Sequence, residues 1–142
     1  MSKQLIDRKE ITIRFSEVDS MAIVWHGNYV KYLEEGRESF GNRFGISYLD
    51  IYANKMMAPV VNMDISFKRQ VKYGETIIVE TKYIDQKAAK LVFNYRIYRK
   101  ENNELVATAT TTQVFIDLNY EMLLYPPEFA LEWKRKMGLL EA

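Results

Sequence analysis

The chain has 142 residues, the length of one domain, and its net charge of +1 gives no reason to expect a nucleic-acid partner. It contains no Cys, which excludes disulfides, iron–sulfur clusters and a thiol nucleophile, and its one His excludes a multi-histidine metal site within a single chain. No stretch approaches the roughly 20 apolar residues of a membrane-spanning helix, and no secretory signal is visible, so we expect no membrane span and a cytoplasmic location.

The beginning of the chain predicts a strand, a loop and a long helix. Residues 9–15 alternate in polarity, with Ile11, Ile13 and Phe15 on one side. The segment 16–27 shows no periodicity. Beyond it, apolar residues recur at spacings of three and four, which is typical of an amphipathic helix. They are Tyr29, Tyr32, Leu33, Gly36, Phe40 and Phe44.

Three small residues indicate how this helix begins, packs and ends. Asn28 is a candidate N-cap, and Gly45 can end the helix in the left-handed conformation that Gly adopts readily. Gly36 lies on the apolar face, where Gly costs about 1 kcal/mol relative to Ala. We therefore expect the helix to approach a sheet closely at Gly36. A short second helix is predicted over 48–53.

After the helices the hydrophobic period changes to two, which predicts strands. Alternate apolar residues define strands over 61–67, 77–83 and 91–97, and a fourth strand over 104–117 is apolar on both faces, as a central or interface strand would be. A short terminal helix is expected after Pro126 and Pro127, with Lys134, Arg135 and Lys136 exposed. One long helix on a five-stranded antiparallel sheet is an α+β arrangement, and its open edges predict self-association.

Positive charge gathers in the middle of the chain. Residues 68–100 hold nine Lys or Arg against three acidic residues. Such a segment can meet an anionic ligand, and it is equally typical of a solvated polar face of a sheet.

The most reactive set of side chains lies in the loop before the long helix, where residues 16–29 read SEVDSMAIVWHGNY. The start of the helix offers unpaired backbone N–H groups that can stabilise an oxyanion. Asp19 lies upstream in the same loop and can act beside them as a nucleophile or as a general base for water. The alternative is structural: Asp19 caps the loop, and His26 is a hydrogen-bonded structural residue.

Two other acidic residues allow the same choice between a structural and a functional role. Glu34 and Glu35 lie on the predicted helix between Lys31 and Arg37, which is typical of an exposed charged face. They remain reserve candidates, because a carboxylate on this helix can also face a ligand. The chain has no nucleophile elbow, phosphate-binding loop or dinucleotide-binding glycine motif.

The loop and the helix that follows it resemble the hotdog-fold thioesterases of the 4-hydroxybenzoyl-CoA thioesterase family. Their pattern reads approximately acid-x-Asp-x-x-Gly-x-Val-x-aromatic/His-x-x-Tyr, and this chain supplies Glu17, Asp19, Val24, His26 and Tyr29 in register. The segments HGNYVKYLEEGRESF and KRQVKYGETI are also similar to the family. The resemblance extends over about residues 8–130 and is particularly close to the acyl-CoA thioesterases associated with the Tol–Pal system.

The resemblance implies one hotdog domain over 1–142 and an active site at a dimer interface. Asp19 falls on the family's catalytic carboxylate, and the backbone N–H of His26 on the donor that polarises the thioester carbonyl. Tyr29 is placed to contact the substrate, although it is equally a core residue. Lys87 and Lys90 lie near the family's basic segment for the coenzyme A nucleotide.

Two positions depart from the family pattern. Glu17 replaces the commoner Asp and remains a reserve candidate for the catalytic acid. Ala22 replaces the usual Gly, which is costly if the position needs a positive φ or a close approach to the ligand.

The sequence therefore predicts an acyl-CoA thioester hydrolase that needs no metal or prosthetic group and assembles as a homodimer, and further as a homotetramer. The alternative is a non-catalytic acyl-CoA-binding or regulatory hotdog protein. A hotdog dehydratase is disfavoured, because no matching His-and-acid signature is present. The acyl specificity, and the choice between coenzyme A and carrier-protein thioesters, are not encoded in a recognisable motif.

Overall fold

A computed structural model describes residues 4–140 of the chain. Its helices and strands follow in the order β1 (Ile6–Thr12), α1 (Tyr29–Phe44), α2 (Tyr48–Ala53), β2 (Met56–Met57), β3 (Val60–Phe67), β4 (Thr76–Ile84), β5 (Lys90–Arg99), β6 (Leu105–Val114), β7 (Ile116–Asp117) and α3 (Glu128–Lys136). Two 3-10 turns, Phe15–Glu17 and His26–Asn28, flank the loop before α1.

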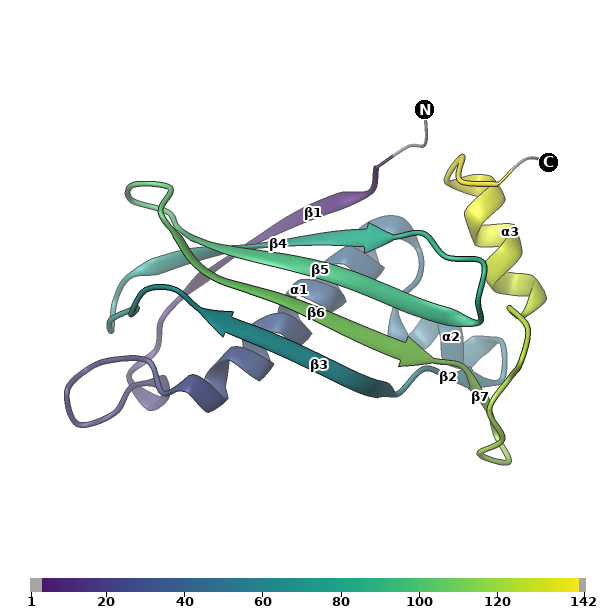
Figure 1. The fold of residues 1–142 in the computed structure, drawn as a ribbon, viewed down its shortest axis with the longest axis horizontal. Helices are drawn as coiled ribbons and strands as arrows, with labels where there is room; N and C mark the ends of the chain where they lie inside the picture. Colours follow the sequence, from purple (N-terminus) through teal and green to yellow (C-terminus); the bar gives the residue numbers. More distant parts are fainter. Residues whose placement is uncertain (1–3, 141–142) are drawn as a thin grey trace.

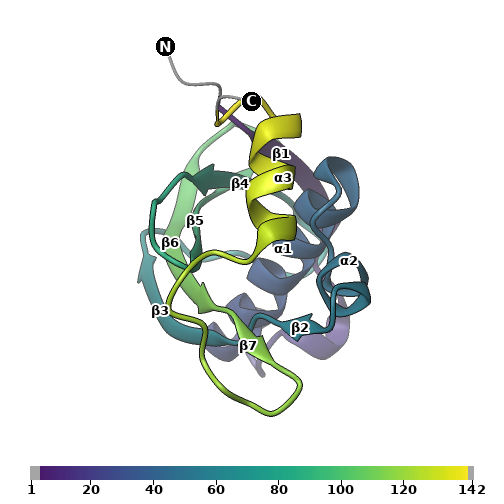
Figure 2. The same ribbon diagram turned by 90° about the vertical axis from the view of Figure 1, so that its right-hand side faces the viewer.

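The main sheet has five antiparallel strands in the order β1-β4-β5-β6-β3, and α1 crosses one of its faces (Figure 1). Seen along its length, the sheet curls around α1, while α2 and α3 lie at one end (Figure 2). The predicted α+β architecture is confirmed. No helix among residues 4–140 is long and apolar enough to cross a membrane.

The core forms where the apolar stripe of α1 meets the concave face of the sheet. Tyr32, Leu33 and Phe40 of α1 are fully buried, and the predicted inner faces of β4 and β5 are buried opposite them. Each such side chain contributes about 1.5–3 kcal/mol on burial. The inward-facing residues predicted from period-two patterning are therefore confirmed for β4 and β5.

At Gly36 the backbone of α1 lies close to β4. A Cβ at this position would lie 2.6 Å from Val79 Cγ1 and 2.7 Å from Thr81 Oγ1 of β4. No side chain larger than hydrogen fits there without movement. The close approach expected from the sequence is confirmed.

Four local expectations are wrong. The first strand ends at Thr12, and Phe15 lies in a 3-10 turn with 76% of its surface exposed. The Asn28 side chain does not cap α1, because it donates instead to the Glu17 carbonyl at 2.7 Å. Phe115 separates β6 from β7, so the last predicted strand is two strands. Lys134 is buried, because it pairs with Asp85 at 3.0 Å beside the turn between β4 and β5.

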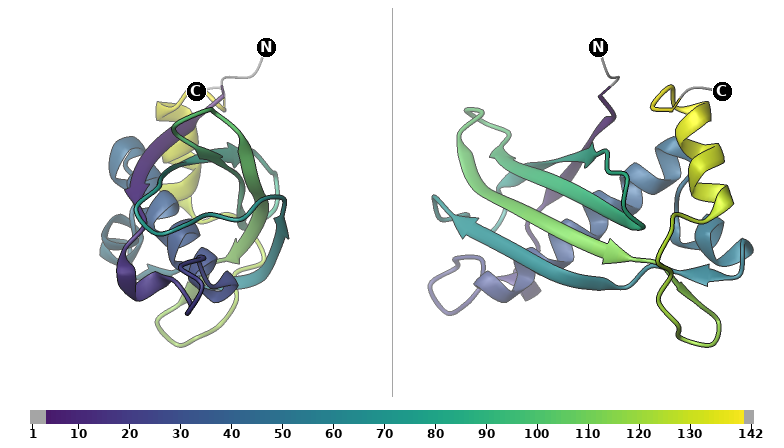
Figure 3. Two further views of the ribbon diagram at one scale, coloured as in Figure 1. Left: turned by 90° about the vertical axis from the view of Figure 1, so that its left-hand side faces the viewer. Right: turned by 45° about the vertical axis from the view of Figure 1, so that its right-hand side comes forward.

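The connection between β3 and β4 is the part of the fold that matters most for the site. Since β6 and β5 lie between these two strands, residues 68–75 must cross one end of the sheet. We call them the crossover segment, and Figure 3 shows it spanning the end of the sheet beside the loop that precedes α1.

We predict that Gly36→Ala lowers the free energy of unfolding by about 1–3 kcal/mol, the usual cost of overpacking, although Ala is the better helix former. Ser39→Ala in the same helix is the control and should change stability by less than about 0.5 kcal/mol. Urea denaturation of both variants measures the difference. Equal stabilities for the two variants would contradict the close contact.

Candidate active site

The loop before α1 folds into a tight hairpin of its own. Val18 and Val24 form an antiparallel bridge, and the Asp19 N–H donates to the Ile23 carbonyl at 2.8 Å. The hairpin docks on the crossover segment, since the Val24 N–H donates to the Val71 carbonyl at 2.8 Å. These backbone bonds fix the loop against the sheet, so its side chains are held in place.

Asp19 uses one oxygen to close the hairpin and leaves the other free. Its Oδ1 accepts the N–H groups of Met21 at 2.8 Å and Ile23 at 3.3 Å. Within residues 4–140 nothing bonds to Oδ2, and the side chain is exposed. The structural role considered from the sequence is therefore present, and it is compatible with chemistry at the second oxygen.

Ala22 occupies the turn of the hairpin with φ of 61°. This is the left-handed region, where a Cβ is unfavourable and Gly is the common choice. Of the two conditions expected to make Ala costly at this position, the positive φ is present, so the chain places Ala there at a cost in stability.

Glu17 supports the hairpin from beneath. Its carboxylate is buried, accepts the Arg14 N–H at 2.8 Å and pairs with the Arg14 guanidinium at 3.3 Å. Its carbonyl accepts the N–H of Trp25 at 3.1 Å and the side chain of Asn28. These contacts occupy Glu17 in holding the loop to the start of α1, and Glu17 does not line the pocket described next.

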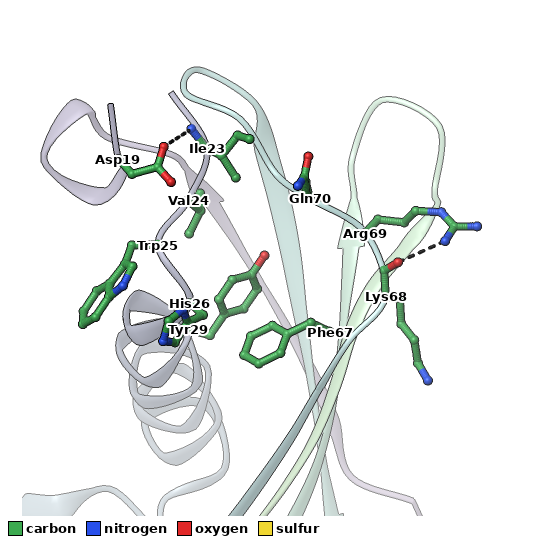
Figure 4. A pocket seen from close by; sticks show the side chains of 10 residues that line it. All are labelled: Asp19, Ile23, Val24, Trp25, His26, Tyr29, Phe67, Lys68, Arg69 and Gln70. Atoms are coloured by element: carbon green, nitrogen blue, oxygen red, sulfur yellow. Dashed lines mark hydrogen bonds between the residues drawn. The ribbon is translucent and has the colours of Figure 1, made fainter. Parts of the chain in front are cut away.

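A pocket of about 540 Å³ opens between the loop and the crossover segment. Figure 4 shows Asp19 and His26 on one side, residues 67–70 on the other, and Tyr29 between them. The volume lies in the range of small-molecule sites. The pocket lining consists of Asp19, Ile23, Val24, Trp25, His26, Tyr29, Phe67, Lys68, Arg69 and Gln70.

His26 begins the 3-10 turn that leads into α1. Within residues 4–140 its backbone N–H has no hydrogen-bond acceptor, as expected for the first residues of a helix. The exposed imidazole packs edge-on against Phe67, with ring centroids 6.3 Å apart. The pocket thus holds a free carboxylate oxygen together with a free N–H donor at the positive end of a helix.

Tyr29 forms the inner wall of the pocket. It is buried, and its ring contacts Tyr32 and Phe67 with centroids 5.5 and 5.0 Å away. Burial raises the pKa of the Tyr29 hydroxyl, a rise that Glu75 reinforces and Arg99 opposes. The hydroxyl is therefore neutral at physiological pH and can donate a hydrogen bond.

Sequence reasoning missed the wall made by the crossover segment. Phe67 ends β3, and Lys68, Arg69 and Gln70 follow it directly into the pocket lining. The available signal was the start of the basic run at Lys68, but no periodicity places that run opposite a loop some fifty residues earlier in the chain.

The other predicted residues lie elsewhere. Glu35 pairs with Arg14 at 3.4 Å, and Glu34 lines a separate pocket of about 350 Å³ between α1, α2 and β3. Lys87 and Lys90 are exposed at the turn between β4 and β5, at the opposite end of the sheet from the Asp19 loop (Figure 1). Their binding role stays a prediction and would need a second copy of the chain.

No group of three or more His, Cys, Asp or Glu side chains among residues 4–140 is arranged to hold a metal ion.

Comparison with known proteins identifies the family and the fold of the chain. Residues 13–133 match the family described as "Thioesterase-like superfamily". The "Putative acyl-CoA thioesterase YneP" of Bacillus subtilis (strain 168) is 37% identical over 79% of this chain and 80% of its own. The DHNA-CoA thioesterase from Staphylococcus aureus superposes with a TM-score of 0.82 at 25% identity, covering 94% of this chain and 92% of its own.

The 4-hydroxybenzoyl CoA thioesterase from Pseudomonas sp. strain CBS-3 superposes with a TM-score of 0.77 at 20% identity, covering 90% of this chain and 98% of its own. At that identity the likeness concerns the fold alone. Together these matches confirm the predicted hotdog fold.

We predict that Ala22→Gly raises the free energy of unfolding by about 0.5–1 kcal/mol, because it removes the Cβ from a left-handed residue. Ala88→Gly in the turn between β4 and β5 is the control, since Ala88 has no positive φ. There the change only raises the conformational entropy of the unfolded chain, so it should lower stability. Thermal unfolding of both variants should show opposite shifts. A loss of stability in Ala22→Gly would contradict the strained turn.

Proposed function

Because the chain belongs to the thioesterase-like superfamily, we propose that it hydrolyses acyl-CoA thioesters to a carboxylic acid and coenzyme A. The observation that carries this proposal is that Asp19 and His26 line one pocket. Within residues 4–140 one oxygen of Asp19 and the backbone N–H of His26 have no hydrogen-bond partner. Thioester hydrolysis requires these two functions: activation of a nucleophile and stabilisation of the oxyanion that forms.

In the proposed mechanism, the thioester carbonyl lies at the start of α1 and its oxygen accepts the N–H of His26. Asp19 takes a proton from a water molecule through Oδ2, and the resulting hydroxide adds to the carbonyl carbon. The tetrahedral oxyanion is stabilised by the N–H donor and by the helix dipole. When the intermediate collapses, the C–S bond breaks and the leaving thiolate takes up the proton held by Asp19.

Direct attack by Asp19 is the other form of the same proposal. Oδ2 would then add to the carbonyl carbon, the thiolate would leave, and water would hydrolyse the mixed anhydride. Both forms use the same free oxygen. In either form the His26 imidazole is placed to orient the thioester, because it lines the pocket beside Phe67.

A non-catalytic acyl-CoA-binding protein is the second candidate. The observation in its favour is that Asp19 already serves the hairpin through two backbone hydrogen bonds. Release of free thiol from short and aromatic acyl-CoA thioesters separates the two candidates. The narrower assignment to the Tol–Pal-associated subgroup remains a prediction.

The proposed assembly is a homodimer formed through β3. This strand of eight residues lies at an edge of the sheet, where no other strand of residues 4–140 pairs with its outer backbone groups. Val61 and Phe67 are 59% and 51% exposed. Phe67 also lines the pocket, so a second copy on this edge would close the site. A homotetramer built from two such dimers remains part of the prediction.

We predict that Asp19→Asn lowers kcat for acyl-CoA hydrolysis by about 10²-fold or more, because the amide cannot act as base or nucleophile. The amide oxygen can still accept the two loop N–H groups, so the melting temperature should change little. Steady-state kinetics and thermal unfolding measure the two effects.

The control for this variant is Asp117→Asn. Asp117 closes a turn of the same form, since its Oδ1 accepts the N–H groups of Asn119 at 2.8 Å and Glu121 at 3.1 Å. It lies on the β7 hairpin at the other end of the sheet. If both variants lose activity only in proportion to their folded fraction, the mechanism proposed for Asp19 is wrong.

For the assembly, we predict that Val61→Lys at the edge of β3 shifts the protein toward monomer in light scattering and lowers activity with it, because the charge cannot be buried between two edges. Lys9→Glu on the opposite edge strand β1 is the control and should leave the mass unchanged. A wild-type protein that is monomeric at micromolar concentration would exclude the proposed dimer.

A further inference from the structure

The pocket has two chemically different walls. Asp19 contributes the acidic wall, and Lys68 and Arg69 form the basic wall across from it. In Figure 4 the side chains of Lys68 and Arg69 extend away from Asp19, toward the outside of the pocket. A substrate whose reacting group lies at Asp19 and whose tail runs over Phe67 therefore leaves the pocket beside two cations.

Both cations are available to a ligand. Within residues 4–140 Lys68 forms no ion pair. Arg69, whose side chain is 64% exposed, pairs with Glu104 at 3.6 Å and donates to the Lys68 carbonyl at 3.0 Å. An exposed pair of this kind contributes little and can be exchanged for a stronger anionic partner. The backbone beneath them is fixed, because the N–H groups of Lys68 and Arg69 both donate to the Val106 carbonyl, at 2.8 and 3.1 Å.

We propose that Lys68 and Arg69 hold the phosphate that adjoins the pantetheine arm of the substrate. This assignment rests on the proposed thioester hydrolysis, in which the acyl group and the sulfur lie at the Asp19 wall. The pantetheine arm then runs over the Phe67 ring, which is apolar and half exposed. The first charged group along that arm is a phosphate, and adjacent Lys and Arg side chains suit it, with Arg able to bind two of its oxygens.

The same phosphate occurs in coenzyme A and in the prosthetic arm of acyl carrier proteins. The proposed ligand is therefore any phosphopantetheine thioester. Its phosphate is recognised by the crossover segment rather than by Lys87 and Lys90. Lys68 and Arg69 line the same pocket as Asp19 within one chain. Lys87 and Lys90 lie at the other end of the sheet, so they could contact the same substrate only from a second copy of the chain.

The experiment compares Lys68→Gln/Arg69→Gln with the wild type on three thioesters of one acyl group: the coenzyme A ester, the 4′-phosphopantetheine ester and the phosphate-free pantetheine ester. The double variant should raise KM about 10-fold or more for the first two, the effect of losing two charge-assisted hydrogen bonds, and weaken the salt dependence of KM. With the pantetheine ester, kcat/KM should stay within about twofold of the wild type.

The control variant is Lys55→Gln/Lys136→Gln, which removes two exposed lysines far from the pocket and should leave KM unchanged for all three esters. Equal losses on all three esters in Lys68→Gln/Arg69→Gln would overturn the inference, since they would indicate a distorted pocket. A loss confined to the coenzyme A ester would overturn the assigned phosphate. The assignment to Lys68 and Arg69 would also be overturned if KM rose to a comparable extent only in Lys87→Gln/Lys90→Gln.

Two further measurements separate this inference from the proposed function. Calorimetric binding of free coenzyme A and of free pantetheine reads the phosphate contact without turnover, and only the former should weaken in Lys68→Gln/Arg69→Gln. If the wild type hydrolyses no thioester yet binds coenzyme A through this pair, the proposed function fails and the phosphate site stands. Acyl carrier protein thioesters should show the same sensitivity as the 4′-phosphopantetheine ester.

Discussion

The docking of the Asp19 hairpin on the crossover segment is the interaction on which the site depends. The Val24 N–H bonds to the Val71 carbonyl at 2.8 Å, and the Tyr73 N–H bonds to the Ala22 carbonyl at 3.0 Å. These two segments are far apart in the chain, and each supplies one wall of the pocket. The sheet order makes the contact possible, because β3 and β4 lie on opposite sides of β5 and β6 and the chain between them must cross the end of the sheet.

The chain uses one kind of turn twice, and the comparison shows what makes a turn a site. Asp19 and Asp117 each accept two backbone N–H groups through Oδ1, and each turn has a non-glycine residue with positive φ, Ala22 at 61° and Tyr120 at 65°. The carboxylate geometry is therefore common to both turns. Asp19 differs in its neighbours: a helix start with a free N–H, an aromatic wall and a pocket. The chemistry proposed for Asp19 rests on that setting rather than on the turn.

Local signals in the sequence were enough for the architecture but not for both walls of the site. Period-two patterning predicted the inner faces of β4 and β5, and Gly36 predicted the close helix contact, because both can be recognised from the residue types within one helix or strand. The motif around Asp19 located one wall. The second wall depends on the order of strands in the sheet, which no local pattern encodes, so Lys68 and Arg69 were counted only as part of a basic segment. Asn28 failed as a cap because the buried Glu17 carbonyl offered its amide a tertiary partner.

Phe67 belongs to the edge of the sheet, to an aromatic cluster and to the pocket at the same time. It ends the edge strand β3, it packs against His26 and Tyr29, and it lines the pocket next to the basic wall. An aromatic side chain that is 51% exposed in a single chain still has surface to bury. The outer edge of β3, which pairs with no other strand of residues 4–140, offers the direction from which a second copy would approach Phe67 and enclose the space beside it. Assembly on this edge would also remove water from the space beside Asp19, where a lower local dielectric strengthens the N–H contact to an oxyanion. Dimer formation and catalytic competence are therefore expected to be coupled through this one residue.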